Sequence, residues 1–241
     1  MGNVVNYLFG WLCKKLIVDV KYFKQTSGVY KIIPFGDYCL PRVITTINGL
    51  KPSRENGEES FPFDLCFSKF EDNLKLFCNG FEHFYNGVQY NNDKNCWDNR
   101  QTKMLFNHDS MSLLDDFKQR YDNRIKNLYT VLENENKFIF FLVATWSPIP
   151  QEKIQLFIKE ILKYRKAGTF AIIVVNQSSQ EMCYKIENVY CKNLHKDKTF
   201  AKINKDGNWV EMLKEMRDIN AVIFNYKVVK FLSKIIKLNL G

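Results

Sequence analysis

Cys39 is the residue whose position in this chain most clearly suggests chemistry. It follows a predicted strand, 29–35, and the pair Gly36-Asp37, and it lies at the predicted start of a helix, 41–50. A thiol there meets unpaired backbone N–H groups and the positive end of the helix dipole, and both favour the reactive thiolate. Gly36, Asp37 and the N–H groups that follow them can also form an oxyanion site. The pattern predicts a nucleophilic cysteine, and the alternative is a cysteine buried in a strand-to-helix turn.

A nucleophilic cysteine needs a base within hydrogen-bond reach. His108 follows a short predicted strand, 103–107, and precedes a long predicted helix, which is where α/β proteins usually place ligand-binding and catalytic groups. His83 lies between two Phe residues and is expected beside the core, whereas His195 lies in a polar stretch and is expected at the surface. His108 is therefore the predicted base.

The base in turn needs an acceptor that orients it. Asp64 follows a Pro-Phe pair, Asp109 adjoins His108, and Asn176 ends a predicted strand. Asp64 can equally be the N-cap of the helix that follows it. Asp109 and His108 are neighbours, and neighbouring side chains on an extended segment point apart. The sequence leaves the choice among the three acceptors open.

The elements that must position these residues follow from the apolar pattern. Two unbroken apolar runs, 138–144 and 170–175, predict strands that are buried on both faces, as in a parallel sheet. With these two runs extended slightly, strands are predicted at 29–35, 103–107, 137–145, 169–176 and 199–203. Apolar residues at helical spacing predict helices over 41–50, 65–78, 110–132, 150–164, 209–216 and 221–238. Residues 51–60 and 86–101 are predicted to be polar loops.

This alternation of strands and helices predicts an α/β fold, specifically a three-layer sandwich with a mostly parallel central sheet and helices on both faces. Residues 29–241 are expected to form a single α/β domain, and residues 1–28 an apolar N-terminal extension or helix. A length of 241 residues suffices for one sizeable core.

Composition narrows the function classes. A hydrophobic content of 46% excludes global disorder. The net charge of +9 favours anionic partners, but no block of five or six like charges occurs, so no specific nucleic-acid binding is expected. The seven cysteines are odd in number and form no C-x-x-C pair, which argues against a disulfide framework and a structural zinc site. The sequence thus predicts thiols in the reducing cytoplasm, with no cofactor and no metal ion.

The N-terminus suggests a possible membrane contact. Gly2 follows Met1 and permits N-myristoylation, although Asn6 stands where the usual pattern has Ser or Thr. Residues 4–13 are apolar but too short to span a bilayer. They suit packing on the body of the protein or, with Lys14-Lys15, weak association with a membrane surface. The amphipathic C-terminal helix allows the same two interpretations.

The order of short motifs from residue 29 to 209 resembles the family of "putative papain-like cysteine peptidases". The motifs that carry the resemblance are Phe35-Gly36-Asp37-Tyr38-Cys39, Pro62-Phe63-Asp64, the pair Phe81 and Phe84, His108-Asp109, the helix segment Arg120–Ile125 before the strand at 137–143, and Trp209. The chain departs from the family pattern at Phe35, where Leu is expected, and at Leu65, where Trp is expected.

This resemblance implies a thiol hydrolase that uses a cysteine and a histidine, which are Cys39 and His108 here. The third catalytic residue is not given by the resemblance, and Asp64 and Asn176 are kept as catalytic candidates. It also implies a peptide or protein substrate with an amide bond, and esters remain open. The alternative is a non-catalytic protein, viral or bacterial, that interacts with partners inside a host cell and associates with membranes through its N-terminus. The basic charge, the aromatic content and the acylation motif at Gly2 favour this alternative. The oligomeric state is not specified by the sequence.

Overall fold

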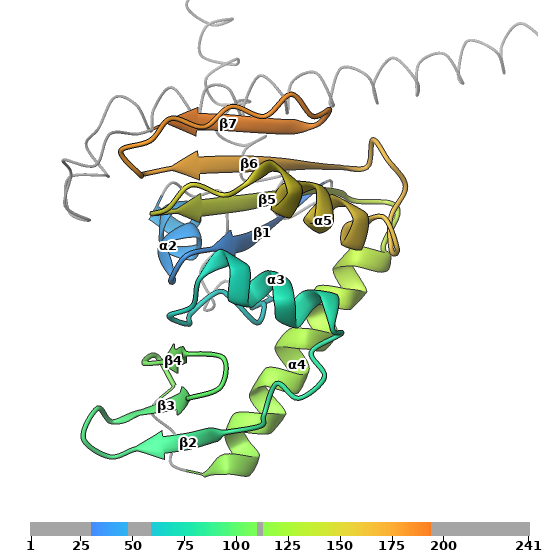
Figure 1. The fold of residues 1–241 in the computed structure, drawn as a ribbon. Coiled ribbons are helices and arrows are strands. Elements are labelled where there is room, and N and C mark those ends of the chain that lie inside the picture. Colours follow the sequence, from blue (N-terminus) through green and yellow to red (C-terminus); the bar gives the residue numbers. More distant parts are fainter. Residues whose placement is uncertain (1–29, 48–58, 110–112, 194–241) are drawn as a thin grey trace, which may run out of the picture. The chain divides into compact units, whose positions relative to one another are not determined.

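A four-stranded parallel sheet is the main sheet of the described residues (Figure 1). The computed structural model describes residues 30–47, 59–109 and 113–193. The strands are β1 (Tyr30–Gly36), β5 (Phe138–Thr145), β6 (Phe170–Asn176) and β7 (Val189–Asn193), in the spatial order β1-β5-β6-β7. Every residue of β6 is buried, and so is every residue of β5 after the first. The unbroken apolar runs of these two strands follow from this burial on both faces.

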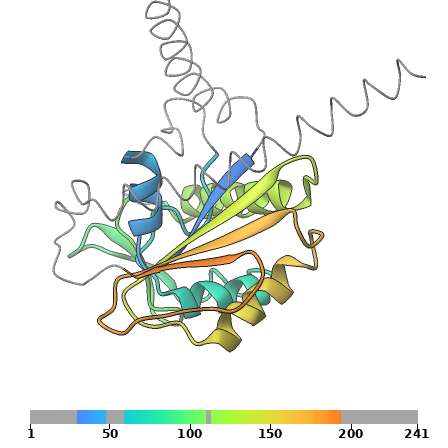
Figure 2. The ribbon, with the colours of Figure 1, turned by 90° about the horizontal axis from the view of Figure 1, so that it is seen from above.

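Helices cover both faces of this sheet (Figure 2). The helices α3 (Phe70–Cys78) and α5 (Gln151–Ile161) lie on one face, and α2 (Leu40–Ile47) lies on the other. Phe35 of β1 contacts Phe70 of α3 and Phe157 of α5, with ring centroids 5.6 and 4.4 Å apart. Phe141 of β5 also contacts Phe157, at 5.1 Å. Burial of such rings stabilises the fold by about 1.5–3 kcal/mol each and fixes the α3 and α5 side of the sheet.

A second, antiparallel sheet of three strands packs against the long helix α4 (Leu114–Glu133). Its strands are β2 (Val88–Asn91), β3 (Cys96–Asn99) and β4 (Met104–Phe106), in that order. Phe117 of α4 contacts both Trp97 of β3 and Phe106 of β4, with ring centroids 5.0 Å away in each case. These aromatic contacts hold the residues after β4 close to α4.

The predicted α/β architecture is confirmed, since a parallel sheet lies between helices on its two faces. Two local predictions are wrong. Residues 65–69 are not helical, because α3 begins only at Phe70 and Phe67 instead forms a bridge with Leu105. Residues 86–101 are not a loop but hold the hairpin of β2 and β3, whose polar residues lack an apolar strand pattern. The sequence also gave no prediction of β7.

Several predictions lie outside the described residues. These are the extension at 1–28 with Gly2, the strand at 199–203, the helices at 209–216 and 221–238, His195 and Trp209. Within residues 30–47, 59–109 and 113–193, no helix is both long and apolar enough to cross a membrane.

Candidate active site

The candidate site begins at the carboxyl end of β1, where Gly36 lies against the neighbouring strand. Gly36 has a φ of +144°, and a Cβ built on it would lie 2.3 Å from the backbone oxygen of Ala144. No residue with a side chain fits this position without moving β5. Gly36 therefore brings the end of β1 into close contact with β5.

Asp37 connects three parts of the fold at this point. Its Oδ1 accepts a hydrogen bond from the backbone N–H of Phe70 at 2.8 Å, which is the first residue of α3. Its Oδ2 accepts one from the backbone N–H of Trp146 at 2.8 Å and lies 3.1 Å from the hydroxyl of Thr145. Asp37 is only 5% exposed. It thus supplies the N-terminal cap of α3 from a distant part of the sequence and ties β1 to the end of β5.

Cys39 lies at the N-terminal end of α2, as the sequence predicted. Its backbone carbonyl accepts the first hydrogen bond of the helix, from the N–H of Val43 at 3.0 Å. The preceding residue, Tyr38, has a φ of +57°, a conformation that non-glycine residues rarely adopt and that is often found at functional sites. The chain therefore makes a tight, strained turn from β1 into α2 with the thiol at its end.

The electrostatic surroundings of Cys39 differ from the expectation of a favoured thiolate. The side chain is half-buried, and this burial raises the pKa of the Cys39 thiol above its ordinary value. A hydrogen bond from its own backbone amide lowers the pKa, but this is the smaller effect. The backbone hydrogen bond thus favours the thiolate, while desolvation dominates and keeps the resting thiol protonated.

The backbone N–H groups beside Cys39 are partly used within the fold. The N–H of Asp37 donates to the carbonyl of Ala144, and the N–H of Tyr38 donates to the carbonyl of Ser68, both at 2.7 Å. These two groups therefore serve as structural donors. Gly36 and Asp37, which were predicted to belong to an oxyanion site, have structural contacts here. Gly36 allows the close approach to β5, and the Asp37 carboxylate accepts the first N–H of α3.

The segment 66–68 lies between the Cys39 turn and the strand that leads to His108. Tyr38 packs its ring on Phe67 at 4.9 Å, and Phe67 exchanges two backbone hydrogen bonds with Leu105, at 2.7 and 2.9 Å. His108 follows β4 and is exposed. Among the residues that the structure describes, no hydrogen bond joins Cys39 and His108. The two predicted catalytic residues thus lie on turns that border the same intervening segment without touching.

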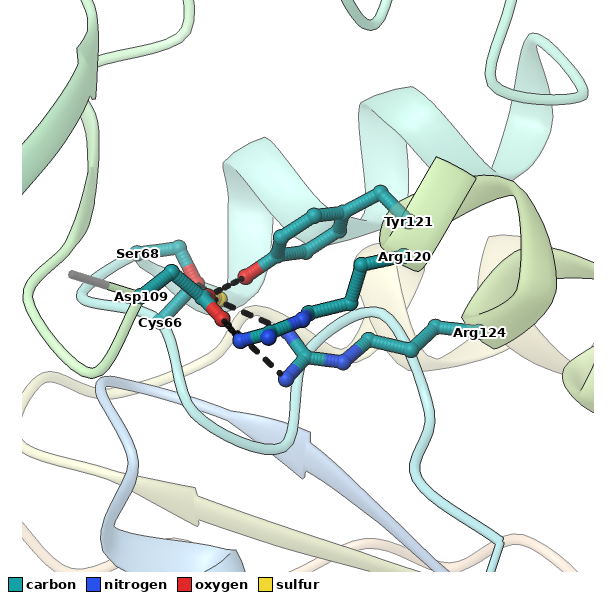
Figure 3. A network of polar contacts seen from close by, with 6 residues as sticks. All are labelled: Cys66, Ser68, Asp109, Arg120, Tyr121 and Arg124. Atoms are coloured by element: carbon teal, nitrogen blue, oxygen red, sulfur yellow. Dashed lines mark hydrogen bonds and ion pairs between the residues drawn. The ribbon is translucent and has the colours of Figure 1, made fainter. Parts of the chain in front are cut away.

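Asp109 is buried and forms a polar cluster with three residues of α4 (Figure 3). Its Oδ2 accepts a hydrogen bond from the Tyr121 hydroxyl at 2.8 Å, and it pairs with the guanidinium groups of Arg120 and Arg124. Asp109 is fully buried, while its neighbour His108 is exposed. The expectation that these neighbours point apart is confirmed. Asp109 holds the turn after β4 to α4 and is not oriented toward His108.

Asp64 is fully buried and forms an ion pair with Arg42 of α2, with 3.7 Å between Oδ2 and Nη1. It does not cap α3, because that helix begins five or more residues later and takes its cap from Asp37. The alternative interpretation of Asp64 as an N-cap is therefore wrong. Arg42 lies one helical turn after Cys39, so the Arg42–Asp64 pair fixes the first turn of α2 against the segment that contains Asp64.

Cys66 is the first residue of the segment 66–68 and is fully buried. Its sulfur is 3.4 Å from the Ser68 hydroxyl. Burial raises the pKa of the Cys66 thiol to about 12, although the Ser68 hydrogen bond and the charge of Arg124 act in the opposite direction. Cys66 is thus an inert, protonated thiol beside the Asp109 cluster.

Asn176, the remaining candidate, lies at the carboxyl end of β6 in a local network. Its Nδ2 donates to the carbonyl of Gln180 at 2.6 Å and to Oδ1 of Asn193 at 2.7 Å, and its Oδ1 accepts from the N–H of Ser178 at 2.9 Å. This network shapes the turn after β6. His83 is exposed and lies 3.5 Å from Glu82, so the expectation that it lies beside the core is wrong.

Reasoning from the sequence missed Arg42 and Tyr121 as partners of two buried carboxylates. Arg42 pairs with Asp64, and Tyr121 donates to Asp109. A signal was present for Tyr121, because Arg120, Tyr121 and Arg124 lie in the middle of the predicted helix 110–132, with Arg124 three and four residues after the other two. Arg42 carried no comparable signal. Its partner Asp64 is distant in sequence, and only the fold brings the two together.

Comparison with known proteins gives one match. A family model described as "Putative papain-like cysteine peptidase (DUF1796)" matches residues 30–180. No curated protein matches the chain. No solved structure matches it. The matched region includes β1, the Cys39 turn, the Asp109 cluster and the strands β5 and β6.

Proposed function

The chain belongs to the family described as "Putative papain-like cysteine peptidase", and on this basis we propose that it is a thiol hydrolase with Cys39 as its nucleophile. The observation that carries the proposal is the position of Cys39. It follows a parallel strand through a strained turn and begins α2, so its sulfur lies at the carboxyl edge of the sheet. Parallel α/β sheets bind ligands at this edge.

In the proposed reaction, Cys39 attacks the carbonyl carbon of an amide or ester. A bond forms between Sγ and the carbonyl carbon, and the thiol proton passes through His108 to the departing amine or alcohol as its bond to carbon breaks. Water then attacks the thioester, with His108 as its base, and releases a carboxylic acid and the free thiol. No cofactor enters either step.

The assignment of His108 as base is supported by the shared border of the two turns. The segment 66–68 contacts the Cys39 turn on one side and Leu105, three residues before His108, on the other. Catalytic hydrogen bonds are often absent from a resting site and form when substrate binds. His108 is exposed, so its side chain is accessible to a bound substrate.

The test is hydrolysis of p-nitrophenyl acetate and of a peptide amide library, with mass spectrometry of the acylated protein. We expect an acetyl group on Cys39 and loss of turnover in Cys39→Ser. Replacement of His108 by Asn should lower the rate by about 10²–10⁴. The matched control is Cys183→Ser, which removes an exposed thiol and should leave turnover unchanged. Full turnover in Cys39→Ser would refute the proposal.

The second candidate is a non-catalytic interaction protein that keeps the fold. The specific observation in its favour is the burial of Cys39, which raises the pKa of the thiol and lowers its reactivity. A protein partner that is retained equally by the wild type, Cys39→Ala and His108→Ala, combined with no acetylation of Cys39, would favour this candidate over the hydrolase.

A further inference from the structure

Two buried side-chain N–H groups at the carboxyl edge of the sheet have no hydrogen-bond partner. They are Nε1 of Trp146 and Nε2 of Gln177. Gln177 is only 5% exposed. Buried polar groups are almost always paired, so two unpaired donors at the place where α/β sheets bind ligands indicate a missing acceptor. Within the described residues, neither of these two N–H groups donates a hydrogen bond to any acceptor.

The two donors belong to residues that directly follow adjacent strands. Trp146 directly follows β5 and Gln177 directly follows β6, and the last residues of these strands, Thr145 and Asn176, are paired in the register. The ladder continues one residue further, because the N–H of Gln177 donates to the carbonyl of Thr145 at 2.9 Å. The backbones of Trp146 and Gln177 therefore lie next to each other at the carboxyl edge of the sheet.

Trp146 also lies beside the turn that carries Cys39. The side chain of Thr145 contacts Asp37, whose carboxylate caps α3, so Thr145 faces the α3 layer. The backbone N–H of Trp146 donates to Oδ2 of the same Asp37 at 2.8 Å, and Asp37 lies two residues before Cys39. Figure 2 shows α2, which follows this turn, on the other side of the sheet from α3 and α5.

We propose that Trp146 and Gln177 form a subsite that binds an uncharged carbonyl oxygen, such as that of a peptide amide, at the carboxyl edge of the sheet beside the Cys39 turn. Its assignment as a substrate subsite rests on the proposed function. The chemistry of the donors indicates the ligand class, because both are neutral N–H groups. A carboxylate or phosphate would bring a buried charge that needs a cation. The buried cations of the neighbouring network, Arg42 and Arg124, are already paired with Asp64 and Asp109.

The subsite also determines specificity. It distinguishes amides and esters, which present a neutral acceptor, from free acids. A hydrolase whose product is a carboxylate gains from this preference, since the product binds less tightly than the substrate once the bond is cleaved. Gln177 and Trp146 are thus specificity-determining residues that do not exchange a proton or form a covalent bond.

The experiment uses the full chain with the substitution Cys39→Ser, so that binding is measured without turnover. The indole N–H signals of the four tryptophans are recorded by ¹⁵N NMR, and Trp146→Phe and Trp97→Phe assign two of them. The probe is N-methylacetamide, the smallest analogue of a peptide bond, and acetate is the charged comparison. We expect a saturable shift of the Trp146 signal with N-methylacetamide and a much smaller shift with acetate.

The Trp97 signal, which comes from the small sheet, is the internal control for solvent effects. Gln177→Met preserves the size of the side chain but removes its donor, and it should weaken binding of the probe by about tenfold. The proposal is overturned if the Trp146 signal moves no more than that of Trp97, if acetate binds equally well, or if Gln177→Met leaves the affinity unchanged. Hydrolysis by the wild type with an unmoved Trp146 signal would overturn the subsite alone. A saturable shift without any hydrolysis would overturn the hydrolase and leave a binding site.

Discussion

Replacement of Asp37 by Ala should strongly destabilise the fold, because this one carboxylate serves two separate elements. It accepts the N–H groups of Phe70 and Trp146, both at 2.8 Å, in a position that is 5% exposed. A buried donor left without an acceptor costs about 1–3 kcal/mol, and charged hydrogen bonds lie at the upper end. Two such donors predict a loss of about 3–5 kcal/mol in the free energy of unfolding. The measurement is urea unfolding followed by far-UV circular dichroism.

Two further variants separate this explanation from a general effect of removing a charge. Asp93 lies exposed in the turn between β2 and β3, so Asp93→Ala should change the free energy of unfolding by less than about 0.5 kcal/mol. Asp37→Asn keeps the shape but offers only one acceptor oxygen, so one N–H would face the amide NH₂, and an intermediate loss is expected. A loss below about 1 kcal/mol in Asp37→Ala would refute the assignment of this residue as the tie between β1, α3 and β5.

Three other predictions follow from the same geometry. The rate of Cys39 alkylation by iodoacetamide should rise about tenfold per pH unit and continue to rise past pH 9, because burial raises the pKa of this thiol. A rate plateau below pH 7 would contradict this. Peptide mass spectrometry should show Cys66 unmodified until the protein unfolds, because that thiol is fully buried and its pKa is raised further. Gly36→Ala should lower the thermal midpoint sharply or prevent folding, since its Cβ would lie 2.3 Å from the backbone oxygen of Ala144, and a variant of wild-type stability would show that β1 can move. Arg165→Met should lower the free energy of unfolding by about 2–4 kcal/mol, because the guanidinium donates to three carbonyls at the end of α4. Arg165→Lys should recover only part of this loss, because an ammonium lacks the planar set of donors, and urea unfolding measures both variants.

The central sheet was predictable because its strands are buried on both faces. The apolar runs 138–144 and 170–175 have no polar residue that would allow a solvent-facing side, and they correspond to β5 and β6. The hairpin at 88–99 was not predictable by the same argument. Its strands contain Asn, Asp and Gln, and it is held by pairing between strands and by packing of Trp97 on α4. A pattern of hydrophobicity reports burial of a strand, and it does not report pairing of polar strands.

The position of Cys39 was also predictable, since a strand, a glycine turn and the start of a helix are all local features. The role of Asp37 was not, because its partner Phe70 is 33 residues away and its partner Trp146 is 109 residues away. The same holds for Asp64, whose local context suggested a helix cap while the fold pairs it with Arg42. Buried carboxylates take whichever donors the tertiary structure brings to them, so their roles depend on contacts that a single sequence does not reveal.

The raised pKa of Cys39 has a consequence for how a hydrolase of this geometry must work. A thiol that is neutral at rest reacts only after its proton leaves, and burial makes this step unfavourable while the site is empty. Proton transfer must therefore be coupled to substrate binding, when His108 approaches the thiol or the substrate itself changes the surroundings of the sulfur. Such an enzyme would be protected from alkylation and oxidation at rest, since both reactions require the thiolate. A slowly hydrolysed substrate would therefore protect Cys39 from alkylation, because the acyl group occupies its sulfur. A protein in which Cys39 has only a structural role would show no such protection, because its thiol would form no bond with the substrate.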